Sequence, residues 1–198
     1  GGATAAPQRS ETLKFPLLDD VTVSVVLDTP NGNFAEPEAV TQILQETIDT
    51  IFEKKSRFYI LPIDETSTYF QVYLEENGLS KTQYVDGAEV ATADSMIKKS
   101  NLHELSKHFK TDYLVYVRVW TGAPRLTSGG VFTLRQKANV SVDFRVWSEQ
   151  KSDYVYMKRN SATGKATYYS PSRSVKKGLR KAFEQIVADA AKIRASMM

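Results

Sequence analysis

The segment Val131–Trp147 alternates between apolar and polar side chains more regularly than any other part of this chain. Successive side chains of a β-strand point to opposite faces, so the alternation predicts one long strand with a buried face and a solvated face. Gln136 is the single polar residue on the apolar parity, and it indicates a bend or a sheet margin at that position. Ser148–Ser152 follows as a turn, and Asp153–Arg159 is predicted to pair back antiparallel as a hairpin.

Three further segments are predicted to be strands. Val21–Leu27 alternates, with its odd-numbered residues apolar. Asp112–Trp120 is apolar on nearly both parities, which is typical of a central strand covered on both faces. Arg57–Ile63 is short and contains Pro62, which cannot donate to a sheet ladder, so we expect that strand to end early.

Apolar residues at three- and four-residue spacing predict two long amphipathic helices, over Glu36–Lys55 and Ser172–Ala195. A shorter helix is predicted over Thr66–Asn77, with Gly78 as its C-terminal stop. Another is predicted to begin at Asn101–Glu104, which resembles a capping box.

These elements predict an α+β fold with an α/β-like start, in which a helix connects the first two strands. We expect a mixed sheet of about five strands, with the helices packed mainly on one face. Leu79–Ala91 and Thr121–Gly130 are predicted to be irregular. Residues 1–12 are expected to form a flexible tail, and residues 13–198 a single globular domain.

Composition narrows the class of protein. A content of 41% hydrophobic and 25% charged residues is typical of a globular chain. The sequence has no cysteine, which excludes disulfides, thiolate metal sites and a cysteine nucleophile. The small, uncharged residues at positions 1–8 suit a chain from which a targeting segment has been removed, although artificial trimming leaves the same trace.

Charge is distributed unevenly along the chain. Residues 1–100 hold 8 Lys or Arg and 16 Asp or Glu, whereas residues 101–198 hold 18 and 7. A solvated helix face is one reading of the basic excess, and a contact surface for an acidic partner, anionic lipid or polyanion is the other. The candidate partner-binding residues are the eight cations of an acid-free stretch: Lys158, Arg159, Lys165, Arg173, Lys176, Lys177, Arg180 and Lys181.

No catalytic motif is visible. There is no Gly-x-Ser-x-Gly elbow, and the five-residue separation of His103 and His108 places them on different sides of a helix. Gly164-Lys165 lacks the rest of a phosphate-binding loop, because Arg159 and Ala166 stand where glycine and a hydroxyl residue are needed. A turn or strand end is therefore the favoured interpretation of that dipeptide.

Asp28 and Asp64 each follow a predicted strand. Ligands of open α/β sheets bind beyond the carboxyl ends of the strands, so a small-ligand or enzymatic site near these two residues is one hypothesis. Aspartate also caps helices and initiates turns, and both residues precede turn or helix signals. We favour the capping role, and we expect no metal and no cofactor.

The order of elements resembles that of one bacterial superfamily. The short strand Phe58–Ile63 and the stretch Leu105–Val115, which reads LSKHFKTDYLV, are similar to the corresponding parts of curli-secretion lipoproteins, lipoprotein activators of penicillin-binding proteins and the amino-terminal domain of TolB. The resemblance spans roughly residues 20–195, with Thr111 where a glycine is usual. It implies a periplasmic or outer-membrane-associated envelope protein that works by binding other proteins.

The sequence therefore favours a non-enzymatic, extracytoplasmic bacterial domain that binds an envelope protein through its basic cluster. Membrane contact is expected only through a lipid anchor that this sequence does not contain, and nucleic acid is not expected as a ligand. The alternatives are the site near Asp28 and Asp64, and polyanion or anionic-lipid binding through Lys158–Lys181. Self-association and the identity of the partner are left open.

Overall fold

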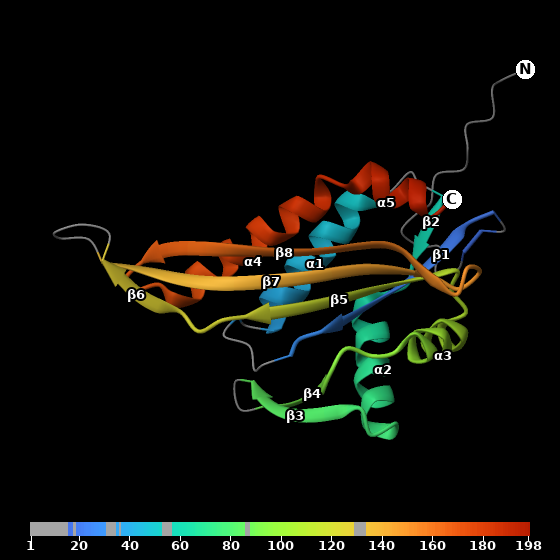
Figure 1. The fold of residues 1–198 in the computed structure, drawn as a ribbon, viewed down its shortest axis with the longest axis horizontal. Helices are drawn as coiled ribbons and strands as arrows, with labels where there is room; N and C mark the ends of the chain where they lie inside the picture. The colour runs from blue at the N-terminus through green and yellow to red at the C-terminus, as the bar shows by residue number, and fades with distance from the viewer. Residues whose placement is uncertain are drawn as a thin grey trace, which may run out of the picture.

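A mixed six-stranded sheet forms the centre of the computed structural model, which describes residues 16–17, 19–30, 35, 37–52, 57–85, 88–128 and 134–198 (Figure 1). The strands of this sheet are β1 (Val21–Asp28), β2 (Phe58–Ile60), β5 (Tyr113–Thr121), β6 (Arg125–Ser128), β7 (Leu134–Ser148) and β8 (Asp153–Thr167). Five helices accompany it in the described part of the chain. The predicted α+β class is confirmed, with six strands in place of about five.

The first part of the sheet is parallel. β1 pairs with β2 on one side and with β5 on the other, and Val23 lies opposite both Ile60 and Tyr113. Helix α1 (Pro37–Ile51) connects β1 to β2, which confirms the predicted strand–helix–strand start. β2 stops before Pro62, as expected, and Ile63 already belongs to the next helix.

The long strand β7 organises the antiparallel part. Its strand character is confirmed over Leu134–Trp147, and the first three residues of the prediction lie outside the described residues. One edge of β7 pairs first with β6 and then with β5, and the other edge pairs with β8. β8 continues to Thr167, so the prediction of a strand end or turn at Gly164-Lys165 is wrong.

Gly164 explains why β8 continues there. A Cβ atom at this position would lie 1.8 Å from the carbonyl oxygen of Ser174 and 2.4 Å from the backbone nitrogen of Gly178, both in helix α4 (Pro171–Val187). The strand and the helix therefore pack backbone against backbone, and only glycine leaves room for this approach.

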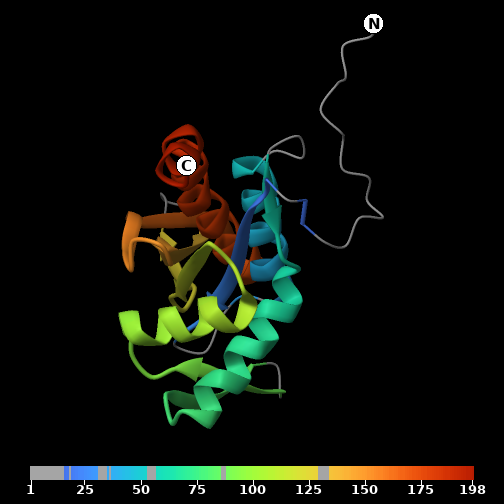
Figure 2. The same ribbon diagram turned by 90° about the vertical axis from the view of Figure 1, so that its right-hand side faces the viewer.

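Both faces of the sheet carry helices (Figure 2). Helices α1, α4 and α5 (Ala190–Ser196) cover one face, where side chains such as Val25, Val117 and Phe144 form the first core. Helices α2 (Ile63–Glu76) and α3 (Lys99–Phe109) lie on the other face and form the second core around Tyr116 and Trp147. Most of the helical residues thus lie on one face, as predicted, and the second core is an addition to that prediction.

The closing helix is divided in two. A single helix over Ser172–Ala195 was expected, but α4 ends at Val187 and α5 begins at Ala190. At the break, Asp189 accepts hydrogen bonds from the Tyr156 hydroxyl at 2.7 Å and from Lys158 Nζ at 3.1 Å. The change of direction returns α5 to the first core, where Ile193 is fully buried.

Two predicted irregular regions contain strands. Within Leu79–Ala91, β3 (Ser80–Val85) pairs antiparallel with β4 (Ala88–Ala93) as a separate hairpin, and β6 lies within Thr121–Gly130. The hairpin packs on α2. Its sequence alternates weakly because it offers small buried residues such as Ala91 and Ala93.

Helix α3 begins two residues before the predicted start. Asn101 was expected to be the N-cap, but it is the third helical residue, and its Oδ1 accepts the backbone N–H of Lys98 at 3.0 Å. Helix α2 likewise starts at Ile63, three residues before the prediction, and Gly78 follows its end with φ +64°. No helix in the described ranges is long and apolar enough to cross a membrane.

Candidate functional site

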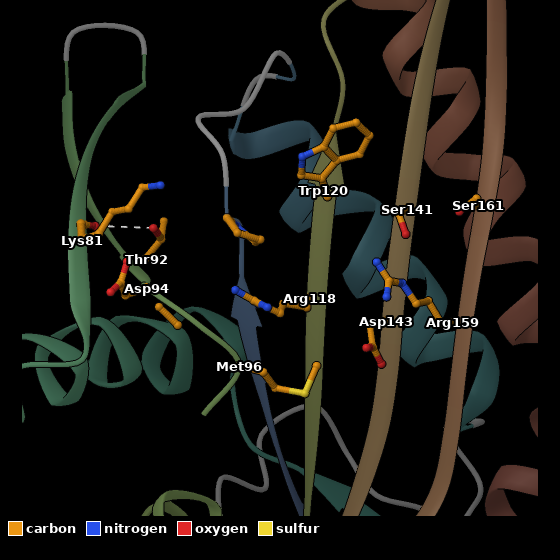
Figure 3. A pocket seen from close by; sticks show the side chains of 12 residues that line it. Lys81, Thr92, Asp94, Met96, Arg118, Trp120, Ser141, Asp143, Arg159 and Ser161 are labelled. Atoms are coloured by element: carbon orange, nitrogen blue, oxygen red, sulfur yellow. Dashed lines mark hydrogen bonds between the residues drawn. The ribbon is translucent and has the colours of Figure 1, made fainter. Parts of the chain in front are cut away.

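A groove of about 540 Å³ separates the β3–β4 hairpin from the part of the sheet that α2 and α3 leave uncovered (Figure 3). β5, β7 and β8 each contribute two side chains to the sheet wall: Arg118, Trp120, Ser141, Asp143, Arg159 and Ser161. The opposite wall comes from the hairpin and the residues after it, and includes Lys81, Thr92, Asp94 and Met96. This groove lies beside the carboxyl ends of the parallel strands β1 and β5.

A buried carboxylate holds the two walls together beneath the groove. Asp28, the last residue of β1, is 1% exposed, and its Oδ2 accepts hydrogen bonds from the Tyr116 hydroxyl at 2.7 Å and Arg118 Nε at 3.0 Å. Its Oδ1 accepts the backbone N–H of Ala93 in β4 at 3.1 Å. Asp28 therefore ties the hairpin to the sheet, a tertiary role in place of the local capping role that we favoured.

Burial dominates the electrostatics of this network. Desolvation raises the pKa of Asp28, while the Tyr116 hydrogen bond, the positive charge of Arg118 and the Ala93 amide act in the opposite direction. Burial also raises the pKa of Tyr116, and the nearby charge of Asp28 raises it further. Tyr116 consequently stays a hydrogen-bond donor, and the Arg118 side chain, which is 20% exposed, keeps its Nε fixed on the carboxylate.

The sheet wall presents an aromatic surface and an available cation. Trp120 is 37% exposed. Arg159 lies opposite Asp143 in the β7–β8 register, yet Asp143 pairs with Arg145, at 2.9 Å from Oδ1 to Nε. Arg159 is exposed, and within the described residues it has no ion pair of its own. The wall can therefore bind by charge-assisted hydrogen bonds and by stacking.

Asp64 lies elsewhere. It is an exposed residue in the first turn of α2 and borders a separate hollow with Glu38 and Glu46 of α1. β2, which precedes it, ends opposite Val23, well before Asp28 along β1. The structure thus does not bring Asp28 and Asp64 together, and no cluster of three or more His, Asp or Glu suited to a metal occurs among the described residues.

The basic stretch is divided among several places. Lys158 and Arg159 are neighbours in β8 and point to opposite faces of the sheet. Lys158 Nζ contacts Asp189 and the carbonyl oxygen of Gln185, whereas Arg159 lines the groove. Residues that are adjacent in the basic stretch therefore lie on two different surfaces of the protein.

On α4 the cations differ in their contacts. Arg180 pairs with Glu46 of α1 at 2.9 Å, and Lys181 Nζ donates to the carbonyl oxygen of Thr163 at 3.3 Å. Arg180 and Lys181 therefore hold α4 against α1 and β8, and Lys176 is not free of contacts either. Of the other α4 cations in the predicted set, Arg173 and Lys177 are exposed and have no ion pair among the described residues, as is also true of Arg159 and Lys165 in β8.

The two histidines lie apart, as their spacing predicted. His103 Nδ1 contacts a carboxylate oxygen of Glu149 in the turn after β7. His108 stacks on Tyr69 of α2, with ring centroids 3.7 Å apart and planes 4° from parallel. Both contacts join α3 to its surroundings.

The sequence did not single out Arg118, Trp120 or Ser161 as site residues. Arg118 and Trp120 share one parity near the carboxyl end of a strand that is otherwise apolar, directly after Tyr116 on the same parity. That position beside the carboxyl end of β1 was the available signal. The surface around Arg118 and Trp120 forms a groove only because the β3–β4 hairpin lies opposite it.

Comparison with known proteins gives matches in structure alone. No family model matches the sequence, and no curated protein matches it. Lipoprotein GNA1162 from Neisseria meningitidis has 12% identity and a TM-score of 0.42, over 88% of this chain and 98% of that chain. The LpoB C-terminal domain from Escherichia coli has 9% identity and a TM-score of 0.37, over 71% and 81%.

TolB from Acinetobacter baumannii also matches, with 14% identity and a TM-score of 0.36, over 90% of this chain and 28% of that chain. Lipoproteins and TolB are among the proteins that the sequence resemblance named. With identities and TM-scores this low, we take no functional residue and no partner from them.

Proposed function

We propose that this protein is a non-enzymatic binding protein of the bacterial cell envelope, outside the cytoplasm, and that its groove receives a segment of a partner protein. The envelope setting follows from the sequence resemblance. The observation that carries the binding role is the sheet wall of the groove, where Arg159 has no ion pair among the described residues and lies two strands from the exposed Trp120.

The chemistry of the wall favours binding over catalysis. Tryptophan and arginine are the side chains that most often dominate protein interfaces, because they combine large contact area with hydrogen bonding. Arg159 suits a carboxylate of the partner, and Trp120 suits an apolar or aromatic side chain. The described groove residues include no histidine or cysteine, and Asp28 beneath them has its oxygens occupied by three donors.

A photo-cross-linking amino acid at Ser161 tests the proposal in envelope fractions of the source organism. Ser161 is exposed and lines the groove, and Thr68 is an exposed position on α2 that serves as control. We expect a discrete protein adduct from Ser161, none of that size from Thr68, and loss of the adduct with Arg159→Glu. Lys151→Glu, in the turn after β7, is the matched charge reversal and should leave the adduct intact.

Equal adducts from both positions, or an adduct that survives Arg159→Glu, would contradict the assignment to the groove. The basic residues of α4 are one part of the contact surface that the sequence predicted, the other part being Lys158, Arg159 and Lys165 of β8. Arg173→Glu with Lys177→Glu tests the α4 part in the same experiment. If that double variant removes the adduct while Arg159→Glu does not, the partner binds at α4.

A small anionic ligand is a second candidate, because a cavity of about 540 Å³ lies in the size range of small-molecule sites. A thermal-shift screen with metals, nucleotides and sugars addresses it. Stabilisation by an anionic compound that disappears in Arg159→Glu would support this candidate, and the absence of any shift would count against it.

A further inference from the structure

One end of the sheet exposes a group of large apolar side chains. Leu126 is 58% exposed, Leu134 is 54%, Tyr168 is 57% and Tyr169 is 71%. They lie together because Leu126 of β6 is opposite Gln136 of β7, and Gln136 Nε2 donates to the carbonyl oxygen of Tyr168 at 2.7 Å. We call this end, formed by β6, the start of β7 and the end of β8, the tip (left in Figure 1).

The tip also carries a row of cations. Arg125 of β6 lies directly opposite Lys137 of β7, which lies directly opposite Lys165 of β8. Like charges in directly opposed positions repel one another and destabilise a sheet. Arg135 stands one row further out, and no acidic residue occurs in Arg125–Ser128, Leu134–Val142 or Asn160–Thr167.

No acidic side chain in these described parts of β6, β7 and β8 therefore neutralises the positive charge of the tip. Paired side chains share a face, so the cation row lies on the face that carries the groove, and Leu126 lies on the opposite face. The tip therefore has Leu126 and Leu134 on one face and the cations on the other, and the exposed Tyr168 and Tyr169 follow the end of β8 at the same end of the molecule.

We propose that the tip docks on the surface of an anionic lipid bilayer. Tyrosine and leucine side chains enter the headgroup region, and lysine and arginine are attracted to anionic headgroups. A soluble polyanion would contact the cations and leave Leu126 and Leu134 in water. The combination is that of a peripheral membrane contact. It differs from our expectation of contact through a lipid anchor alone, and it shares Lys165 with the anionic-lipid alternative that the sequence offered.

Vesicle flotation tests this with the purified chain. We expect the protein to float with vesicles of phosphatidylcholine mixed with phosphatidylglycerol, to stay behind with phosphatidylcholine alone, and to detach as salt rises. The double variant Lys137→Glu and Lys165→Glu should weaken binding by about tenfold or more, because two attractions become repulsions. The double variant Lys107→Glu and Lys151→Glu makes the same charge change on α3 and in the turn after β7, and should bind as wild type.

Apolar contact is tested separately. Leu126→Ser should weaken vesicle binding several-fold, whereas Val72→Ser, on an exposed position of α2, should not. Thermal unfolding of each variant shows that it is folded. Equal binding to neutral and anionic vesicles, or no binding to either, would overturn the proposal. Binding to heparin that competes with vesicles and is unaffected by Leu126→Ser would also overturn it, in favour of a polyanion.

Discussion

Replacing Asp28 by asparagine should loosen the β3–β4 hairpin from the sheet while both cores stay folded. The carboxylate accepts three hydrogen bonds: two at Oδ2, from Tyr116 and Arg118, and one at Oδ1, from the Ala93 amide. An asparagine has one acceptor oxygen. If that oxygen faces Tyr116 and Arg118, its NH₂ group faces the Ala93 N–H, and two donors oppose each other.

The expected loss of stability follows from these contacts. A buried donor without a partner costs about 1–3 kcal/mol, and a hydrogen bond to a neutral acceptor is roughly half as strong as one to a charged acceptor. The neutral amide side chain would, in return, avoid the desolvation that raises the pKa of Asp28. We therefore expect Asp28→Asn to lower the free energy of unfolding by about 2 kcal/mol.

Two measurements check this prediction. Urea unfolding gives the global change, and amide hydrogen exchange should show that Ala93 loses protection while amides of β5 and β7 keep most of theirs. Asp94→Asn makes the same chemical change at the exposed position next to Ala93, and should alter stability by less than about 0.5 kcal/mol. Unchanged stability together with unchanged protection of Ala93 would refute the role of Asp28.

Two further predictions concern packing and pH. Gly164→Ala should lower the free energy of unfolding in urea by about 3 kcal/mol or more, because its Cβ would meet the Ser174 carbonyl oxygen at 1.8 Å. Gly178→Ala should cost less, because the nearest atom to its Cβ is a side-chain methyl at 2.9 Å. Equal costs for the two variants would argue against the backbone contact. The Tyr156 and Lys158 hydrogen bonds lower the pKa of Asp189, so its contribution is present above the unfolded pKa near 3.8 and is lost as pH falls through the folded value. Asp189→Asn should therefore have a lower Tm than wild type at pH about 7, with a difference that vanishes in strong acid, and a constant difference would contradict this.

Sequence patterns predicted the elements that pack against the first core. The parity of Val131–Trp147 and the spacing in Glu36–Lys55 and Ser172–Ala195 depend on burial against one sheet face, and burial of that kind leaves a clear period. Among the hairpin residues whose side chains the structure describes, the buried ones are the small residues Ala91, Thr92 and Ala93. Small and polar buried residues leave a weak period, and the hairpin was not predicted for that reason. The helices of the second core were predicted, but their position on the second face of the sheet was not.

The groove could not be predicted from the residue pattern of any one strand. Asp112–Trp120 reads as apolar on both sides, and nothing within it tells that Trp120 lies beyond the helices that cover Tyr116. That follows only from where α2 and the hairpin lie. The division of the basic stretch was different, because alternation along β8 already sends Lys158 and Arg159 to opposite faces.

The outer edge of β8 affects how copies of this protein coexist. Among the described strands, β8 pairs with β7 alone, so the other edge of this 15-residue strand has no strand partner, although the Thr163 carbonyl oxygen accepts a hydrogen bond from Lys181. Such edges recruit strands from other molecules and start aggregation unless something prevents it. Arg159 and Lys165, which have no ion pair among the described residues, place positive charge along this strand, so two copies approaching edge to edge would repel each other. We therefore expect these cations to oppose edge-to-edge pairing of two copies, whether or not they bind a partner.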